Sequence, residues 1–303
     1  MMTRSDNTIW IAGAKGQLAH AIQEVAKRHP SAPRLVLSTR QTLDHTSSKE
    51  VEQFIEENQP NFLINGIAFT NVDLAESRYI EAVKANARIP YCLALAAEKA
   101  GITMLHISTD YIYGCETLHP RTPYIETDTP HPTNAYGLSK YLGEEVLRLT
   151  NACYYILRTS WLYSPMSWGH KSFYRSILQK GEAGESLSVV TDEVSTPTSV
   201  CTLAEVILQI IADYNTSHQL PLGTYHVTDE GEASRYQFAE AILKLSPKTA
   251  AMPITSITQR DLQLPAHRPN YSTLSTQKIQ SYYPSLIRPW HERLQEIYQY
   301  DNK

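Results

Sequence analysis

The sequence lacks a basic surplus, a membrane-length apolar run and an apolar leader. Its 303 residues carry 27 Lys and Arg against 31 Asp and Glu, so it has no excess positive charge of the kind that binds nucleic acid. No apolar run approaches the roughly 18 residues of a membrane helix. The first eight residues are polar, unlike a secretory signal. We therefore expect a cytoplasmic protein with neither a nucleic-acid nor a membrane partner.

Cysteine is also scarce, and no Cys-x-x-Cys pair occurs. The four residues are far apart in the chain: Cys92, Cys115, Cys153 and Cys201. Such spacing is typical of reduced thiols in a cytosolic protein. No cluster of metal ligands stands out either, so we expect a site without a metal. Hydrophobic residues make up 42% and charged residues 19%, which is ordinary for a globular chain.

What the sequence does contain is a regular alternation of short apolar runs and helical patterns. The runs predict strands at residues 9–12, 35–37, 62–64, 104–107 and 154–157. Helices are predicted at about 17–28, 82–100 and 136–149, with another around 51–55. This alternation predicts an α/β fold, a doubly wound parallel sheet of the Rossmann type over residues 1–160.

After residue 160 the alternation weakens. Helices are predicted at 171–179, 203–214 and 235–245, with short strands at 187–190 and 224–227. We expect residues 161–303 to form mainly a smaller substrate-binding region, interleaved with the last elements of the sheet. Residues 114–134 contain four prolines and predict a long loop beside the site.

A glycine-containing loop follows the first predicted strand. Gly13 lets the chain turn, and Gly16 lets the backbone approach a pyrophosphate at the start of a helix. The spacing Gly-x-x-Gly-x-x-Ala has fewer glycines than the dinucleotide fingerprint. Taken alone, such a loop is as often a plain turn as a nucleotide site.

The end of the second strand bears on which dinucleotide would bind. Arg40 lies where an arginine accommodates the 2′-phosphate of NADP and an acidic residue would hold the ribose of NAD. The alternative is a solvated surface arginine, and Asp44 follows closely. We expect NADPH, with NADH as the alternative.

The catalytic candidates are a tyrosine and a lysine four residues apart. Tyr136 and Lys140 would share one face of a helix, and a nearby ammonium lowers the pKa of a phenol toward neutrality. Such a pair can protonate a carbonyl oxygen while hydride reaches its carbon. In a chain with 19 tyrosines, a lone match is more often an exposed pair. Thr109, at the end of the fourth strand, supplies a hydroxyl to orient the carbonyl, although a capping turn is the plain alternative there.

Longer strings resemble the extended short-chain dehydrogenases, and within them the dTDP-4-dehydrorhamnose reductases. The resemblance covers nearly the whole chain and is carried by residues 13–18, 65–76, 108–113, 136–140, 157–163 and 268–274. It implies a reductase that uses NADPH to reduce the C4 ketone of a 4-keto-6-deoxy sugar on a nucleotide, most specifically dTDP-4-dehydrorhamnose to dTDP-rhamnose.

The resemblance also implies a role for each matched residue. Thr109, Tyr136 and Lys140 would be catalytic, and Lys140 would also bind the nicotinamide ribose. The cofactor would contact Gly13, Gly16, Gln17, Leu18, Ala68 and Thr70. The substrate would contact Asp110, Tyr111, Trp161 and Arg268.

The sequence departs from the family pattern at Ala19, at Gly66 and Ile67, and at two places in the substrate half. Residues 193–196 differ from the usual Asp-Gln-x-Gly run, and Ser272-Thr273-Leu274 lacks an arginine common there. These changes bear on which sugar is bound more than on the chemistry.

The same resemblance leaves two other functions open: a non-catalytic, nucleotide-binding regulatory subunit like the β subunit of methionine adenosyltransferase, and a sugar-nucleotide epimerase or dehydratase. A homodimer is left open for each of these three functions.

Overall fold

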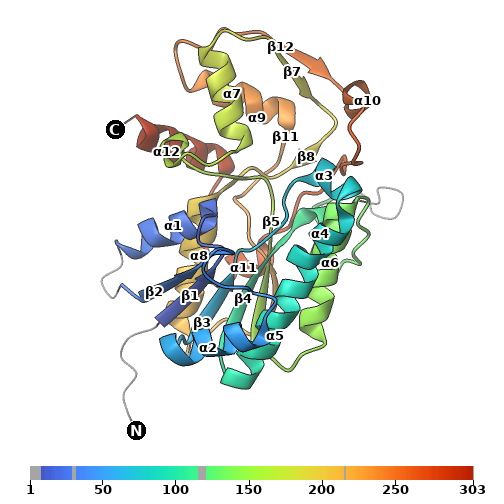
Figure 1. Ribbon diagram of the computed structural model, residues 1–303. Helices are drawn as coiled ribbons and strands as arrows, with labels where there is room; N and C mark the ends of the chain where they lie inside the picture. Colours follow the sequence, from blue (N-terminus) through green and yellow to red (C-terminus); the bar gives the residue numbers. More distant parts are fainter. Residues whose placement is uncertain (1–7, 29–31, 115–120, 215, 303) are drawn as a thin grey trace.

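The computed structural model describes residues 8–28, 32–114, 121–214 and 216–302. A six-stranded sheet, flanked by helices, forms the lower half in Figure 1, and a smaller region caps it. The strands run in the order β10-β5-β4-β3-β1-β2, and every neighbouring pair is parallel. Their bounds are β1 (Thr8–Ala12), β2 (Arg34–Ser38), β3 (Phe62–Asn65), β4 (Thr103–Thr109), β5 (Tyr154–Thr159) and β10 (Gly223–His226). The predicted doubly wound α/β fold is confirmed.

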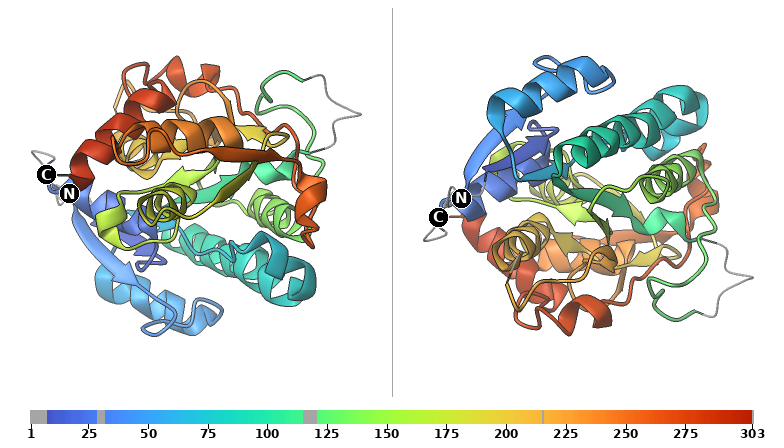
Figure 2. Two further views of the ribbon diagram at one scale, coloured as in Figure 1. Left: turned by 90° about the horizontal axis from the view of Figure 1, so that it is seen from above. Right: turned by 90° about the horizontal axis from the view of Figure 1, so that it is seen from below.

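Both faces of the sheet are covered, which explains why its strands are apolar throughout. Successive side chains of a strand point to opposite faces. Ile9 and Ile11 of β1 accordingly join one core, and Trp10 and Ala12 join another. The first core is covered by α1 (Gln17–Ala26) and α8 (Val200–Asp213), the second by α2 (Ser48–Asn58), α5 (Ile89–Ala100) and α6 (Ala135–Arg148). Figure 2 shows these two helical layers from both ends.

The strand order reverses between β1 and β3, which lie side by side. The chain leaves β1 toward β2 on one side, and leaves β3 toward β4 on the other. Loops that diverge in this way open a crevice at the carboxyl ends of the strands, where doubly wound sheets bind ligands. The fold therefore places the segments after β1, β3, β4 and β5 around one site.

The helix predicted at 82–100 is continuous but not uniform. It begins as α4 (Tyr79–Val83), widens into a π-helical segment (Lys84–Arg88, η1) and continues as α5. A short helix, α3 (Val72–Ser77), precedes it. Single π turns inside helices are often found at functional sites, and here the π turn contains the fully buried Asn86.

The capping region has its own core, centred on Phe238 and Tyr163. Its helices are α7 (Phe173–Glu182), α9 (Arg235–Lys244), α10 (Gln259–Leu262) and α12 (Trp290–Asp301), and its strands are β6 (Leu162–Tyr163), β7 (Leu187–Val190), β8 (Val194–Ser195), β9 (Thr198–Ser199), β11 (Ala233–Ser234) and β12 (Ile254–Ile257). The chain returns to the sheet for α8, β10 and α11 (Gln277–Gln280), which pack on the sheet's first core.

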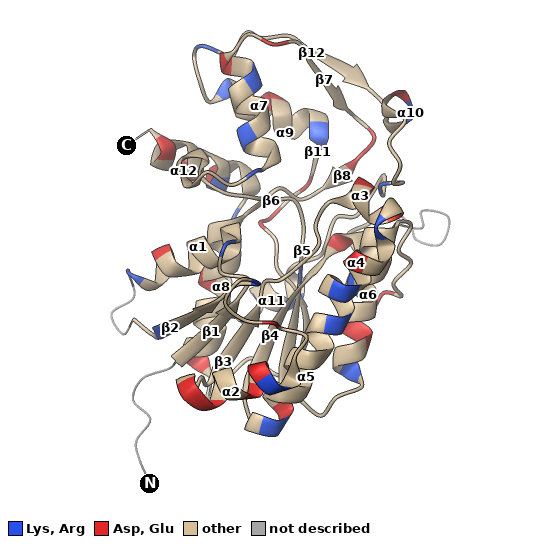
Figure 3. Cartoon of the chain, viewed as in Figure 1, with Lys and Arg blue, Asp and Glu red and all other residues tan. Residues whose placement is uncertain are grey.

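Several smaller predictions concern the rest of the chain. In the predicted loop at 114–134, residues 115–120 lie outside the described part, and so does Cys115. The other three cysteines are free thiols. No helix within the described ranges is both long enough and apolar enough to cross a membrane. Figure 3 shows acidic and basic residues intermixed along α4, α5 and α6, in line with the balanced charge of the sequence.

Candidate active site

The loop between β1 and α1 needs glycine at its first position. Gly13 has φ = 93°, and a side chain there would lie 3.0 Å from the backbone of Gly66 and Ile67. The backbone N–H groups of Gly13 and Ala14 both donate to the carbonyl of Ser38 at the end of β2. Gly16 caps α1 in extended conformation. The predicted glycine loop thus packs closely against the ends of β2 and β3, and the N-terminus of α1 points toward the crevice.

Thr109 and Tyr136 meet at the end of β4. Tyr136 lies in the first turn of α6, which begins after the Asn134 cap. Its hydroxyl is hydrogen-bonded to Thr109, and its ring packs edge-on against Tyr111 with centroids 5.8 Å apart. Burial nevertheless raises the pKa of Tyr136 to about 12, although the Thr109 bond opposes the increase. The strand-end threonine and the helix tyrosine therefore lie within hydrogen-bonding distance of each other, and burial holds the pKa of the tyrosine above its ordinary value, whereas the sequence predicted a lowered one.

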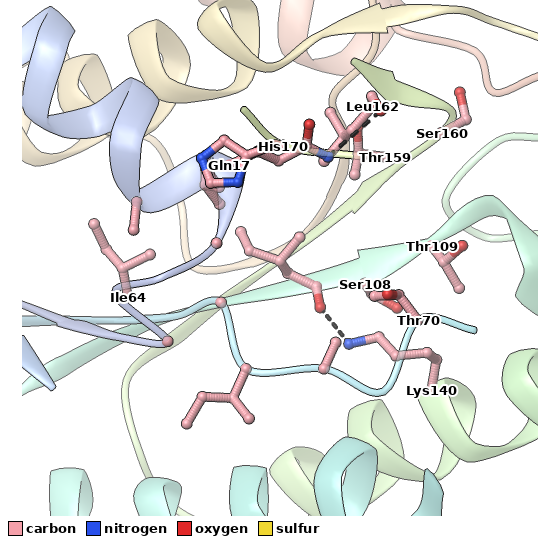
Figure 4. Close-up of a pocket in the computed structure, with 18 of the residues that line it drawn as sticks. Gln17, Ile64, Thr70, Ser108, Thr109, Lys140, Thr159, Ser160, Leu162 and His170 are labelled. Atoms are coloured by element: carbon pink, nitrogen blue, oxygen red, sulfur yellow. Dashed lines mark hydrogen bonds between the residues drawn. The ribbon is translucent and has the colours of Figure 1, made fainter. Parts of the chain in front are cut away.

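The side chain of Lys140 takes a different course from the one predicted by the four-residue spacing. Its ammonium donates a hydrogen bond of 2.5 Å to the carbonyl of Ile107 in β4 (Figure 4). Burial lowers its pKa to about 8, and the nearby Glu144 carboxylate opposes that shift. Lys140 is thus a buried amine with a lowered pKa at the crevice, and it is not a direct partner of the Tyr136 hydroxyl among the described contacts.

One cavity of about 440 Å³ joins most of the predicted residues. It runs from the glycine loop to the end of β4 (Figure 4). The predicted residues that line it are Gly13, Gly16, Gln17, Leu18, Ala68, Thr70, Thr109, Asp110, Tyr136, Lys140 and Trp161. Arg40, Tyr111 and Arg268 are not among its lining residues. Arg40 is an exposed side chain in the turn after β2, so its predicted role remains a prediction.

Asp110 is a carboxyl buried at the junction of the two halves. It accepts hydrogen bonds from Ser272 at 2.6 Å and Ser195 at 3.0 Å, both from the capping side, and from Thr109 at 3.1 Å. Burial raises its pKa to about 6, and the three hydroxyl bonds oppose the increase. Ser195 and Ser272 belong to the two segments in which the sequence departs from the family pattern. Ser195 and the neighbour of Thr273, Ser272, therefore both contact the carboxylate that follows Thr109.

A buried ion pair connects helix α6 with strands β4 and β5. Glu144 of α6 accepts two hydrogen bonds from Arg158 of β5, at 2.9 and 2.7 Å, and one of 2.5 Å from Ser108. Burial pushes the pKa of Glu144 up, but Arg158 holds it below its ordinary value. Because Ser108 lies between Ile107 and Thr109, this network fixes the end of β4 against the helix that carries Tyr136 and Lys140.

Asn86, which the sequence reasoning missed, links the cofactor side to the catalytic helix. Its side chain accepts from the backbone N–H of Phe69 at 2.8 Å and donates to the carbonyl of the same residue at 3.1 Å. It also donates to Ser139 at 2.8 Å, and Ser139 donates to the Tyr136 carbonyl. The π turn aims Asn86 inward, and no local pattern in the sequence signals such a turn.

A second set that the sequence did not reveal comes from the loop between β6 and α7. His170 and Lys171 line the cavity, and Figure 4 shows His170 next to Gln17 at the end of the glycine loop. The loop is fixed to α1 by Trp168, whose ring stacks on His20 with centroids 4.3 Å apart. These residues precede α7 without strand or helix periodicity, so only the fold brings them to the cavity.

Arg268 forms a bidentate pair with Asp73 near the entrance to the crevice. Its two terminal nitrogens lie 3.1 and 2.7 Å from the two carboxylate oxygens of Asp73. Its Nε lies 3.9 Å from Glu193, which also contacts Arg235. Among the described residues, no group of three or more potential metal ligands is present.

Comparison with known proteins adds to this geometry. The family model described as RmlD substrate binding domain matches residues 7–302. The chain is 33% identical, over 96% of both chains, to the spore coat polysaccharide biosynthesis protein SpsK of Bacillus subtilis.

Two solved structures are similar over almost their full length. A dTDP-4-dehydrorhamnose reductase from Clostridium acetobutylicum has a TM-score of 0.88 and 35% identity, covering 98% of this chain and all of the other. The dTDP-4-dehydrorhamnose reductase from Bacillus anthracis, solved in complex with NADP, has a TM-score of 0.86 and 30% identity, with coverage of 97% and 99%.

Proposed function

The chain belongs to the RmlD substrate binding domain family, and from that premise we propose that it reduces the C4 ketone of a nucleotide-linked 4-keto-6-deoxy sugar, with dTDP-4-dehydrorhamnose as the substrate and dTDP-rhamnose as the product. It is an NADPH-dependent sugar-nucleotide reductase. The observation that carries the proposal is the cavity that joins the glycine loop to Thr109, Tyr136 and Lys140.

The residues present fit a dinucleotide. Gly13 has a positive φ and no room for a side chain, as expected of a loop that must lie close to a ligand. Gly16 and Gln17 begin α1 at the cavity, where the N-terminus of a helix favours a pyrophosphate. Ala68 and Thr70 would lie beside the cofactor, and Arg40 would meet the 2′-phosphate. NADPH, when bound, supplies the hydride.

Side chains of the protein supply the proton that the ketone oxygen receives. Thr109 orients the ketone through its hydroxyl, and Tyr136 donates its phenolic proton to the oxygen that becomes the C4 hydroxyl. A proton from water then restores the phenol, while the buried Lys140, which donates to the Ile107 carbonyl, would hold the nicotinamide ribose beside the ketone. The ketone thus gains a hydride and a proton to become an alcohol. Asp110 and Trp161 line the same cavity and would contact the sugar.

The test is a panel of 4-keto sugar nucleotides assayed with NADPH and NADH, comparing the native chain with Tyr136→Phe. We expect consumption of NADPH that matches formation of the 4-hydroxy sugar, and a decrease in kcat of roughly 100- to 10,000-fold in the variant. NADPH affinity should be retained, since the phenol hydroxyl is removed without changing the glycine loop. Tyr141→Phe, in the same helix, serves as the matched control.

Normal turnover in Tyr136→Phe would refute the assigned role of this tyrosine. A native chain that binds NADPH but reduces no member of the panel would be a non-catalytic nucleotide-binding protein. Bound NAD after purification, with no net cofactor consumption, would instead indicate an epimerase or dehydratase. We further propose that the enzyme works in the cytoplasm, as its free thiols and balanced charge suggest.

A further inference from the structure

Arg235 is a second guanidinium at the junction of the cap and the sheet. It is the first residue of α9, directly after the Ser234 cap. Its backbone N–H donates to the carbonyl of Glu193 at 3.1 Å. The start of α9 and the hydrogen bond to Glu193 therefore both hold the backbone of Arg235 in place. Its side chain extends from this fixed position.

The side chain is held flat without using its terminal nitrogens. Its guanidinium carbon lies 3.6 Å from the ring centre of Trp161 and 5.0 Å from that of Phe173. Its Nε lies 3.4 Å from the Glu193 carboxylate. No hydrogen bond from the two terminal nitrogens to any described residue is present, and the side chain is 18% exposed. The two terminal nitrogens of the planar guanidinium are thus held in one orientation and have no hydrogen-bond partner among the described residues.

Arg268 differs in this respect. Both of its terminal nitrogens donate to Asp73, and one also donates to the Ala266 carbonyl at 3.2 Å. A ligand that bound Arg268 through its fork would have to displace a bidentate carboxylate. Of these two arginines, which share Glu193 as a neighbour, Arg235 is the one whose fork is free.

The position of Arg235 is also close to the reacting end of the site. Trp161, on which it stacks, lines the cavity beside Thr159 and Ser160, and its backbone is held at φ = 42°. That conformation is uncommon for a bulky residue and needs support from its surroundings. Burial raises the pKa of Asp110, whereas the positive charge of Arg235 acts in the opposite direction. Arg235 does not itself line the cavity, but it packs on Trp161, which does, and its charge acts on Asp110 in the cavity wall.

We propose that Arg235 is a specificity-determining residue that binds the diphosphate of the nucleotide sugar through its two free terminal nitrogens. This inference rests on the proposed function, since it takes the substrate to be a nucleoside diphosphate derivative. A guanidinium fork matches two phosphate oxygens in one plane, and such charge-assisted pairs are among the stronger hydrogen bonds in proteins. Glu193 fixes the Nε edge of the guanidinium, and Trp161 packs on its face. The Arg235 side chain therefore loses little conformational freedom when the ligand binds.

The experiment is a calorimetric titration of dTDP, UDP and thymidine into the full-length protein. In Arg235→Gln we expect dTDP or UDP to bind roughly 10- to 100-fold more weakly, as expected for a lost hydrogen bond to a charged group, whereas NADPH affinity is unchanged. Thymidine, which has no phosphate, should bind both proteins equally. Arg235→Lys keeps the charge but not the fork, so it should show a smaller loss. Arg288→Gln, in the segment just before α12 and paired with Glu292, is the matched control.

Unchanged affinity for both diphosphates in Arg235→Gln would overturn the proposal. So would an equal loss for thymidine, because thymidine has no phosphate for Arg235 to bind. If the glutamine variant does not fold, as judged by lost NADPH binding, Arg235→Lys decides in its place, and unchanged diphosphate affinity there overturns the proposal. Failure of the native chain to bind either diphosphate also overturns it. A native chain that binds dTDP through Arg235 but has no reductase activity would contradict only the proposed function.

Discussion

Individual carboxyl groups in this protein are strongly affected by burial, and Asp229 is the clearest case outside the active site. It accepts hydrogen bonds from the backbone N–H of Ser199 at 2.8 Å and from the hydroxyl of Thr202 at 2.6 Å, at the start of α8. Burial raises its pKa from 3.8 to about 7. Because the folded protein then binds this proton more tightly than the unfolded chain does, the group's contribution to stability decreases as pH rises from about 4 to 7.

Asp229→Asn should remove that dependence, because the amide keeps the shape but does not titrate. The free energy of unfolding of the variant minus that of the native protein should rise with pH across this window, by at most about 1.4 kcal/mol per pH unit. It should level off above pH 7. Urea unfolding at a series of pH values measures the difference, and a flat difference between pH 4 and 7 would contradict the raised pKa.

At the residue scale, the sequence predicted those site residues that follow a strand or begin a helix. Thr109 follows from its place at the end of an apolar run, and Tyr136 from its place at a helix start. Asn86, His170 and Arg235 could not be predicted, because each reaches the site from an element whose position depends on the tertiary fold. The Tyr136–Lys140 spacing predicted a shared helix face but not the hydrogen bond of Lys140 to Ile107, which depends on how α6 packs on β4.

At the scale of elements, the position of α6 depends on two glycines where other segments come very close. A side chain at Gly137 would collide with the carbonyl oxygen of Tyr111, and one at Gly143 with the carbonyl oxygen of Asn86. Both obstacles are backbone atoms, which cannot move aside as a flexible side chain can. Close approach at these two points sets the distance from α6 to the turn that follows β4 and to the π turn.

Gly143→Ala should therefore destabilise the protein by about 1–3 kcal/mol through overpacking, although alanine is the better helix former. It should also lower kcat, because α6 carries Tyr136 and Lys140. Thermal unfolding and the reductase assay give the two readouts. Gly101→Ala is a useful comparison: its φ is 65° but nothing lies within 4 Å of the added methyl group, so it should lower stability with little effect on kcat. Equal effects on kcat in the two variants would refute the packing argument.

The main sheet was predictable because its strands are buried on both faces and therefore apolar throughout. Strand β12 was not, because two of its four residues are exposed and the alternation is weak. Helix α12 was not predicted either, although it begins directly after Pro289. The two-residue strands β6, β8, β9 and β11 are too short to leave a periodic signal. They form only because neighbouring segments of the cap lie beside them.

At the scale of the whole molecule, helix α12 holds the loop that precedes α7, and this loop lines the cavity at His170 and Lys171. Asp301 of α12 accepts hydrogen bonds from the backbone N–H groups of Met166 at 2.7 Å and Ser167 at 2.9 Å. The Tyr174 hydroxyl donates to it as well, at 3.1 Å. The loop held in this way carries His170 to the cavity wall. A residue two positions from the C-terminus thus bears on a site built mainly by the N-terminal half.

Asp301→Ala should weaken NADPH binding several-fold and make the loop before α7 more sensitive to proteases, because it leaves two backbone donors and two hydroxyls without their acceptor. The sheet should stay intact, so circular dichroism should not change. Glu292→Ala, in the same helix and paired with Arg288 on the surface, should have no such effect. The idea fails if Asp301→Ala matches the native protein in both NADPH affinity and proteolysis.

The π turn at Lys84–Arg88 has a consequence for insertions and deletions in this chain. An α-helix turns by about 100° per residue, and a π turn absorbs one extra residue without ending the helix. Removing one residue here would restore a regular helix, but the part before the turn would rotate by about 100° relative to the part after it. Ala82 and Leu93, both fully buried, could then no longer face inward together. Deleting the extra residue would therefore give a regular helix that no longer packs correctly against the rest of the protein. We expect such a deletion to be poorly tolerated.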